Sequence, residues 1–194
     1  MTQNAHQDAN AKLLEAILQH VPFDGWSQLS FQAACTDCGI DPSIARIHCP
    51  RGALDLAVRF HQAGDQAMQS QLDDMDLSGL KFREKVTAAV RARIEVISDK
   101  EAVRRGSTLF SLPQNTLEGA SLIWGTSDAI WTYLGDTSAD VNWYTKRASL
   151  SAVYGACILY WLGDDSPDHQ ATWDFLDRRI ENVMQFEKAK AEIN

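Results

Sequence analysis

The sequence predicts an all-helical protein, and two features of the pattern support this prediction. Apolar residues recur at the three- and four-residue spacing of a helix in one segment after another. Prolines, glycines and capping Ser, Thr, Asn or Asp residues separate these segments. The chain has 194 residues, of which 45% are hydrophobic and only five are proline, so we expect an ordered globular protein with a proper core.

The first part of the chain has the layout of a helix-turn-helix unit, which we place at residues 1–52. We expect a first helix over residues 8–21, ended by a proline. A second, short helix begins at a serine within residues 27–30 and is broken by a glycine. A third begins at Pro42, with Asp41 as its cap. Helix, glycine-containing turn and short helix is the arrangement of that motif.

The charge of this unit argues against binding to nucleic acid. Between residues 24 and 55 the only bases are Arg46 and Arg51, against four aspartates. The whole chain carries a net charge of −8, whereas a DNA reader needs cations along the phosphates. We therefore expect a scaffold that keeps the motif's shape without its charge. A ligand-responsive transcriptional regulator is the alternative function.

Cysteines near the same motif invite a comparison with zinc sites. Cys35 and Cys38 have the spacing of paired ligands, and His48 and Cys49 follow. Joint tetrahedral ligation by two adjacent residues is awkward, and small buried thiols are ordinary on an apolar helix. A redox pair is a further alternative. We expect buried thiols, with no metal and no cofactor.

The middle of the chain, residues 53–165, reads as a helical bundle. Helices are expected over residues 53–75 and 80–98, from Lys100 to near Leu112, and from Asn115 or Thr116 onward. The last of these is apolar on more than one face, so it is either buried on two sides or lines a lipid cavity. The candidates for the lining of such a cavity are Trp124, Ile130, Trp131, Leu150 and Ile158.

Residues 81–105 contain eight bases and four acids, a local charge of +4. Two interpretations stay open for this basic segment: solvated helix faces, or a face turned toward an anionic membrane or an acidic partner.

The next two helices suggest a dimer and an amphipathic end. The helix over residues 138–162 is rich in Ala, Gly and Ser, which permits close helix approach as in a bundle or across a dimer. The last helix, in residues 166–194, follows a Ser-Pro start. Its apolar stripe contains Trp173, Leu176, Ile180 and Val183. This stripe either docks on its own domain or engages a membrane.

The start of the helix over residues 138–162 looks like a contact surface. Trp143 and Tyr144 point about 100° apart on a helix, so one core does not bury both. Large amphipathic rings beside an arginine suit a binding surface. The alternative is that Tyr144 packs inward while Trp143 half-covers a loop.

Several short motifs resemble one family, in the same order, over roughly residues 100–186. They are Leu112-Pro113-Gln114-Asn115, Trp131-Thr132-Tyr133-Leu134-Gly135-Asp136, Asn142-Trp143-Tyr144-Thr145-Lys146-Arg147-Ala148, Asp165-Ser166-Pro167-Asp168 and Thr172-Trp173-Asp174-Phe175-Leu176. The chain resembles the accessory family of ubiquinone biosynthesis whose mitochondrial members are called the ninth COQ protein. A weaker resemblance of the first part is to the N-terminal domain of TetR regulators.

The family resemblance implies a TetR-like helical fold, a homodimer, and binding of isoprenoid quinone lipids. It also implies that these lipids are presented to the di-iron demethoxyubiquinone hydroxylase at a membrane. The implied contact with that hydroxylase consists of Asp140, Trp143, Tyr144 and Arg147. Lys146 stands where the family motif has an arginine, which keeps the charge and loses the planar fork.

No catalytic constellation appears in the sequence. A Glu-x-x-His pair, a nucleophile elbow, a phosphate-binding loop and a dinucleotide fingerprint are all missing. We expect a non-enzymatic lipid-binding accessory protein whose partners are an isoprenoid quinone or phospholipid, the hydroxylase, a membrane surface and a second copy. Because no targeting pattern opens the chain, we expect a bacterial cytoplasmic protein, peripheral to the inner membrane.

Overall fold

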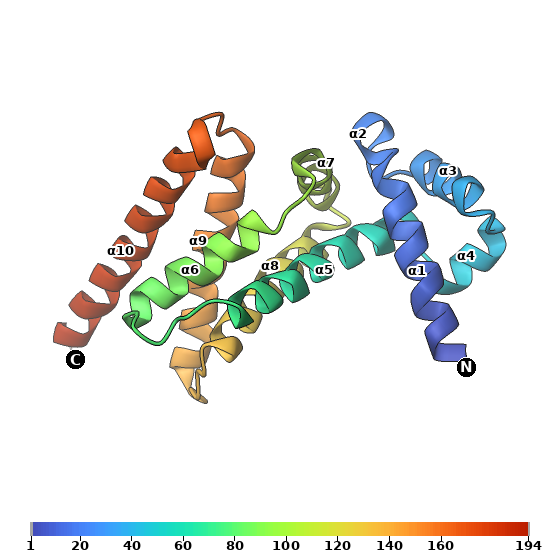
Figure 1. Cartoon of the computed structure of the whole chain (residues 1–194). Helices are drawn as coiled ribbons and strands as arrows, with labels where there is room; N and C mark the ends of the chain where they lie inside the picture. The colour runs from blue at the N-terminus through green and yellow to red at the C-terminus, as the bar shows by residue number, and fades with distance from the viewer. Residues whose placement is uncertain (1, 194) are drawn as a thin grey trace. The chain divides into compact units, whose positions relative to one another are not determined.

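The computed structural model is helical, and it describes the backbone of residues 2–193 and the side chains of residues 9–185 (Figure 1). No strand occurs among these residues. The helices are α1 (Thr2–Leu18), α2 (Val21–Asp24), α3 (Gln28–Cys38), α4 (Pro42–His48), α5 (Ala53–Asp73), α6 (Phe82–Glu95), α7 (Lys100–Phe110), α8 (Thr116–Tyr133), α9 (Val141–Leu162), the short 3-10 helix η1 (Pro167–His169) and α10 (Gln170–Ile193).

Two compact units make up the chain. Unit 1 consists of residues 1–64 and 98–122, and unit 2 consists of residues 65–97 and 123–194. Both α5 and α8 contribute residues to each unit. The division into residues 1–52, 53–165 and 166–194 follows expected roles, and it stays a proposal.

Unit 1 is built around α1 and α3, and its local signals are those expected from the sequence. Ser27 caps α3 by accepting a hydrogen bond from the amide of Ser30 at 3.2 Å. Asp41 caps α4 by accepting from the amide of Ser43 at 2.8 Å. Gly39 ends α3 in the left-handed region, with φ of 63°, which a residue with a Cβ rarely adopts. The local sequence therefore specifies where the helices of the helix-turn-helix arrangement begin and end. The one-turn helix α2, which contains Pro22, was not expected.

Two of the three thiols of unit 1 lie in its core, and that of Cys38 is partly buried. Cys35 and Cys49 are both fully buried, and burial raises the pKa of each thiol. Among the side chains of residues 9–185, no group of three or more His, Cys, Asp or Glu residues is arranged to hold a metal ion. Both thiols therefore stay protonated near neutral pH.

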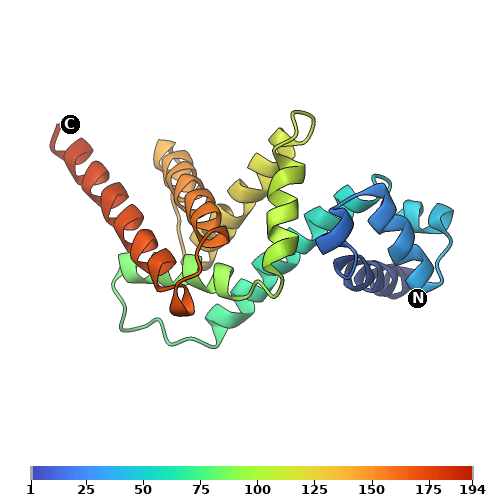
Figure 2. The same cartoon turned by 90° about the horizontal axis from the view of Figure 1, so that it is seen from above.

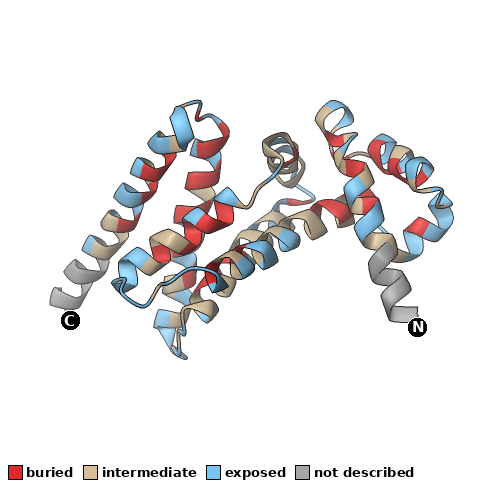
Figure 3. Ribbon diagram, in the orientation of Figure 1, coloured by how far each residue is buried: buried red, intermediate tan, exposed pale blue. Residues whose placement is uncertain are grey.

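Unit 2 contains a hairpin of two long helices. After the link at residues 163–169, α10 turns back beside α9 (Figure 2). Buried residues follow the facing sides of α6, α9 and α10 (Figure 3). The α9–α10 link is held by Asp164, whose carboxylate accepts from the amide and hydroxyl of Thr172 at 2.9 and 2.5 Å. Ser166 accepts from the amide of Ala171 at 3.0 Å, so α10 starts later than the sequence predicted.

A buried polar network crosses the core of unit 2. Arg93 is almost fully buried and donates to Asp65 at 2.6 Å. The hydroxyl of Thr126 donates to the same carboxylate oxygen at 2.8 Å. The Arg93 guanidinium also lies 5.8 Å from the ring centre of the buried Tyr154. A buried charge requires partners. The network that surrounds this charge joins α5, α6, α8 and α9.

Among the described residues, no helix is both long enough and apolar enough to span a bilayer.

Candidate functional site

An apolar groove in unit 2 is the candidate functional site. It has a volume of about 270 Å³ and is walled by α6, α9 and α10, with one aromatic side chain from α8. Its lining side chains are Phe82, Arg83, Val86, Trp131, Asn142, Thr145, Lys146, Ser149, Leu150, Val153, Ile180, Val183 and Met184. Since most of these are aliphatic or aromatic, the groove suits an apolar ligand.

One end of the groove is aromatic. The rings of Phe82 and Trp131 are stacked, with centroids 5.4 Å apart and planes 27° apart. The indole N–H of Trp131 donates to the carbonyl of Lys146 at 3.2 Å. The Lys146 ammonium lies 5.2 Å from the Trp131 ring centre. Trp131 is thereby fixed in position, with its polar atom satisfied and its ring available to the groove.

Most of the polar side chains beside the groove are already hydrogen-bonded or ion-paired within the protein. Lys146 donates to Asp136 at 2.7 Å and to the hydroxyl of Ser138 at 2.6 Å. Thr145 donates to the carbonyl of Asn142 at 3.2 Å, and Arg83 forms an ion pair with Glu181. The groove is therefore suited to a hydrocarbon segment more than to a charged headgroup.

The five candidates for the cavity lining lie in three different places. Trp131 and Leu150 line the groove. Ile130 and Ile158 are buried in unit 2 but do not line it. Trp124 packs against Trp143, with ring centroids 5.9 Å apart. Periodicity identified apolar positions on α8 and α9, but it could not tell which of them face the groove.

The expected membrane-contact residues of α10 face their own unit. Trp173 and Leu176 are buried, and the Trp173 indole donates to the carbonyl of Asp168 at 2.9 Å. The Arg91 guanidinium lies 4.6 Å from the Trp173 ring centre. Ile180 and Val183 line the groove. The apolar stripe of α10 is docked, with α10 forming one wall of the groove.

The four expected partner-contact residues differ in exposure. Asp140 caps α9 by accepting from the amide of Asn142 at 2.9 Å. Tyr144 is 63% exposed, whereas Trp143 is half-buried, and their ring centroids are 4.8 Å apart. Arg147 is only 2% exposed. Tyr144 is therefore exposed enough to contact a partner, whereas Arg147 is buried beneath the surface.

Arg147 is held by two aspartates that were not among the expected site residues. It donates to Asp128 at 2.5 Å and to Asp136 at 3.0 Å. Burial raises the pKa of Asp136, but hydrogen bonds from Lys146, Ser138 and Arg147 outweigh it and hold that pKa well below its usual range. The local signal for this cluster was the Asp136-Thr137-Ser138 turn, in which Ser138 donates to Asp136 at 2.7 Å.

Comparisons with known proteins show what the chain is similar to. Residues 116–187 match the family model COQ9. Over 191 residues the chain is 32% identical to a probable mitochondrial ubiquinone biosynthesis protein coq9 of Dictyostelium discoideum, covering 94% of this chain and 62% of that protein. It is 30% identical over 181 residues to the human mitochondrial ubiquinone biosynthesis protein COQ9, covering 89% of this chain and 57% of that protein. The chain thus spans about three fifths of the length of these relatives.

A solved structure agrees with the fold. The TetR transcriptional regulator from Nitrosomonas europaea matches with a TM-score of 0.73 at 11% identity, covering 91% of this chain and 98% of that one. At this identity the likeness shows the fold alone. The predicted all-helical, TetR-like fold and the predicted family resemblance are both confirmed.

The expected location is corrected by the same relatives. The Dictyostelium, Drosophila and human proteins are all named as mitochondrial. They point to a mitochondrial location, and the expectation of a bacterial cytoplasmic protein at the inner membrane is wrong. That expectation depended on the lack of a targeting pattern in the first residues. The similarity to proteins that are named as mitochondrial outweighs that argument.

Proposed function

We propose that this chain, whose residues 116–187 match the COQ9 family model, is a non-enzymatic accessory protein of ubiquinone biosynthesis that binds an isoprenoid lipid. The relatives are named for ubiquinone biosynthesis, and the apolar groove of unit 2 is the observation that supports lipid binding. Its walls combine aliphatic side chains such as Val153 and Ile180 with the aromatic Trp131.

The size of the groove limits what it holds. A volume of about 270 Å³ holds roughly nine methylene-sized groups, if each takes about the 30 Å³ of a liquid water molecule. That is a segment of a polyprenyl or acyl tail. Each buried CH₂ contributes about 0.8 kcal/mol, so such a segment binds well without any polar contact. The ligand is therefore an isoprenoid quinone intermediate or a phospholipid, held by part of its tail.

Delivery needs a protein contact near the groove. Lys146 lines the groove from the same helix that carries Asp140, Trp143 and Tyr144. We assign contact with the demethoxyubiquinone hydroxylase to these three residues, with Tyr144 as the projecting ring and Arg147 supporting Trp143 from beneath. Asn142 and Lys146 of this helix line the groove, so a partner bound there lies next to the groove.

Membrane contact by α10 requires it to leave its docked position. Trp173, Leu176 and Ile180 are buried against unit 2, and Val183 lines the groove. Release of α10 would expose this face to a bilayer and remove one wall of the groove at the same time. Lipid uptake and membrane contact are then coupled through one helix.

A second copy of the chain suits the outer face of α9. Ala148, Ala152 and Leu159 are exposed along one side of this helix, at spacings of four and seven. Small residues such as Ala148 and Ala152, four positions apart, let two helices approach closely. We propose a homodimer formed through this face, so an Ala152→Arg variant should become monomeric in light scattering. A dimer that persists would assign the contact to another face.

Lipid retention tests the proposed function. The protein is purified from a ubiquinone-producing host, and its bound lipids are identified by mass spectrometry. Ser149 lines the groove, so Ser149→Phe should fill it and reduce bound lipid roughly tenfold, because several CH₂ groups lose their site. The matched control is Ser70→Phe, on an exposed position of α5.

Lipid present in the wild type and the control but lost in Ser149→Phe supports the proposal. Equal lipid in all three variants, or none in the wild type, contradicts it.

A further inference from the structure

Four large apolar side chains are exposed at one end of unit 2, which we call the mouth end. They are Met75, Leu80, Phe82 and Val141, and they are between 37% and 72% exposed. They come from the α5–α6 connection and from the first turns of α6 and α9. Solvent exposure of several large apolar side chains in one region marks a surface that contacts something else.

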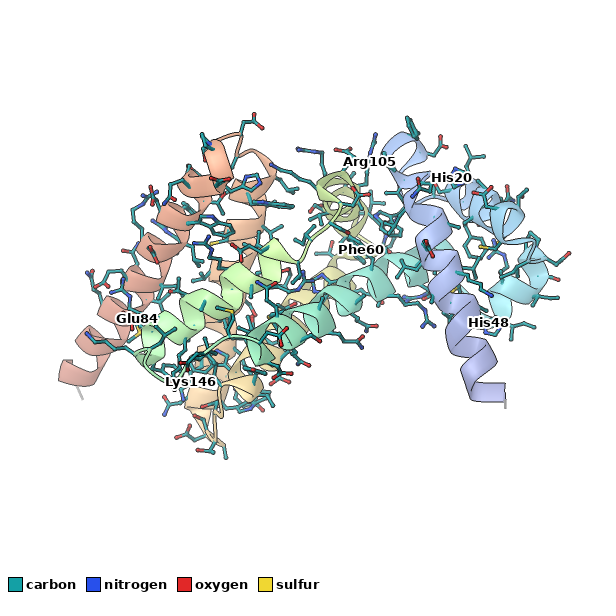
Figure 4. The ribbon with its side chains drawn as sticks, viewed as in Figure 1. His20, His48, Phe60, Glu84, Arg105 and Lys146 are labelled. Carbon is teal, nitrogen blue, oxygen red and sulfur yellow. The ribbon has the colours of Figure 1, made fainter. Side chains whose placement is uncertain are left out.

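Contacts between helix ends bring these segments together. The hydroxyl of Tyr133, at the end of α8, donates to Asp73, at the end of α5, at 2.8 Å. Phe82, the first residue of α6, stacks on Trp131 of α8. Figure 4 shows Glu84 of α6 and Lys146 of α9 at the same end of unit 2. The segments that carry the four exposed side chains are therefore neighbours.

The groove reaches this region. Phe82 and Asn142 line the groove and are themselves exposed. Val141 precedes Asn142 directly, and Leu80 lies two residues before Phe82. The rim of the groove therefore carries apolar side chains that face outward as well as inward.

In the α5–α6 connection and the first turn of α6, the charge is nearly balanced. Residues 73–85 contain four acids and three bases. Three of the acids are hydrogen-bonded locally: Asp73 to Tyr133, Asp76 to Ser78, and Glu84 to the amide of Lys81. A surface of this kind does not select a polyanion, so its apolar side chains determine what it contacts.

We propose that the mouth end sits on a lipid bilayer through Met75, Leu80, Phe82 and Val141, without a requirement for acidic lipid. This inference depends on the proposed lipid binding, because a tail entering the groove must pass from bilayer to protein without exposure to water. An apolar rim against the membrane provides that continuity. It is a contact separate from the α10 stripe, and it needs no movement of α10.

Vesicle flotation tests this placement. The full chain is mixed with phosphatidylcholine vesicles, with and without phosphatidylserine. The test variant is Met75→Gln/Leu80→Gln, since neither residue lines the groove. The control is Leu29→Gln/Ile47→Gln, two exposed apolar residues of unit 1. We expect the test variant to bind neutral vesicles about tenfold more weakly than the control, since two membrane-buried side chains are lost.

A second readout separates this inference from the proposed function. Tryptophan quenching by a brominated ten-carbon alcohol reports groove occupancy without vesicles, and Trp131→Phe identifies the Trp131 signal. Lost flotation with unchanged quenching supports the mouth end as the membrane contact. Unchanged flotation of the test variant, no flotation of the wild type, or flotation only with acidic lipid overturns it. Quenching that is absent from the wild type counts against the groove itself.

Discussion

The Arg147 guanidinium lies 4.1 Å from the ring centre of Trp143, while Arg147 itself is almost completely buried. The charge that positions this ring is therefore inside the protein. Its carboxylate partners Asp128 and Asp136 neutralise it. The aromatic pair at the start of α9 thus has a rigid inner member, Trp143, and an exposed outer member, Tyr144.

Removing Arg147 should destabilise the protein. Arg147→Ala leaves Asp136, whose side chain is also buried, without one of its partners. Breaking a buried ion pair on one side costs about 3–5 kcal/mol. The measurement is urea unfolding followed by circular dichroism. Lys146→Ala is the comparison, because Lys146 is more exposed; an Arg147 variant no less stable than the Lys146 variant would contradict the buried-pair argument.

Replacing Tyr144 should affect binding and leave stability nearly unchanged. Its ring is mostly exposed, and surface substitutions usually change stability by about 0.5 kcal/mol or less. Tyr144→Ala should weaken association with the hydroxylase by roughly tenfold or more, since exposed aromatic residues supply much of the binding energy of an interface. Affinity is measured by pull-down and titration calorimetry, with the exposed Tyr160→Ala as the aromatic control. Equal affinity for both variants would remove Tyr144 from the contact.

The Asp136 cluster should make unfolding depend on acid pH. The folded-state pKa of Asp136 is depressed, because hydrogen bonds from Lys146, Ser138 and Arg147 outweigh the opposing effect of burial. Its contribution to the free energy of unfolding is therefore complete above the unfolded-state pKa of about 3.9, and it is lost as pH falls below that value.

Thermal unfolding of Asp136→Asn tests this dependence. Between about pH 6 and pH 3, which spans the unfolded-state pKa, this variant should lose less stability than the wild type. Asp74→Asn, at an exposed position of the same unit, is the control. Parallel pH profiles for the wild type and Asp136→Asn would show that the cluster does not provide the linkage.

DNA binding should be undetectable despite the TetR-like fold. On α4, which follows the turn of the motif, Ile44 and Ile47 are exposed, and apolar side chains do not replace the cations and amides that bind phosphates and bases. A gel shift with random-sequence DNA at low salt should give no complex. A salt-sensitive complex there would favour the regulator alternative.

The local sequence predicted the caps and the glycine break around α3 and α4 well, whereas the expected first helix, residues 8–21, ends earlier, at Leu18. The caps at Ser27 and Asp41 and the glycine break at residue 39 depend on hydrogen bonds within a few residues, so their pattern is visible in the chain. The start of α10 was predicted less well, because Asp164 and Ser166 bind amides five to eight residues away through a 3-10 turn.

The sequence by itself determined an all-helical chain with a helix-turn-helix unit, and its motifs indicated the family. These properties follow from periodicity, capping and short-range order. Only the tertiary structure decided that Trp131 lines a groove while Trp124 packs on Trp143, and that Arg147 is buried while Tyr144 projects. The reason is geometric: a helix places neighbouring residues on different faces, and only packing against distant helices decides which face is covered.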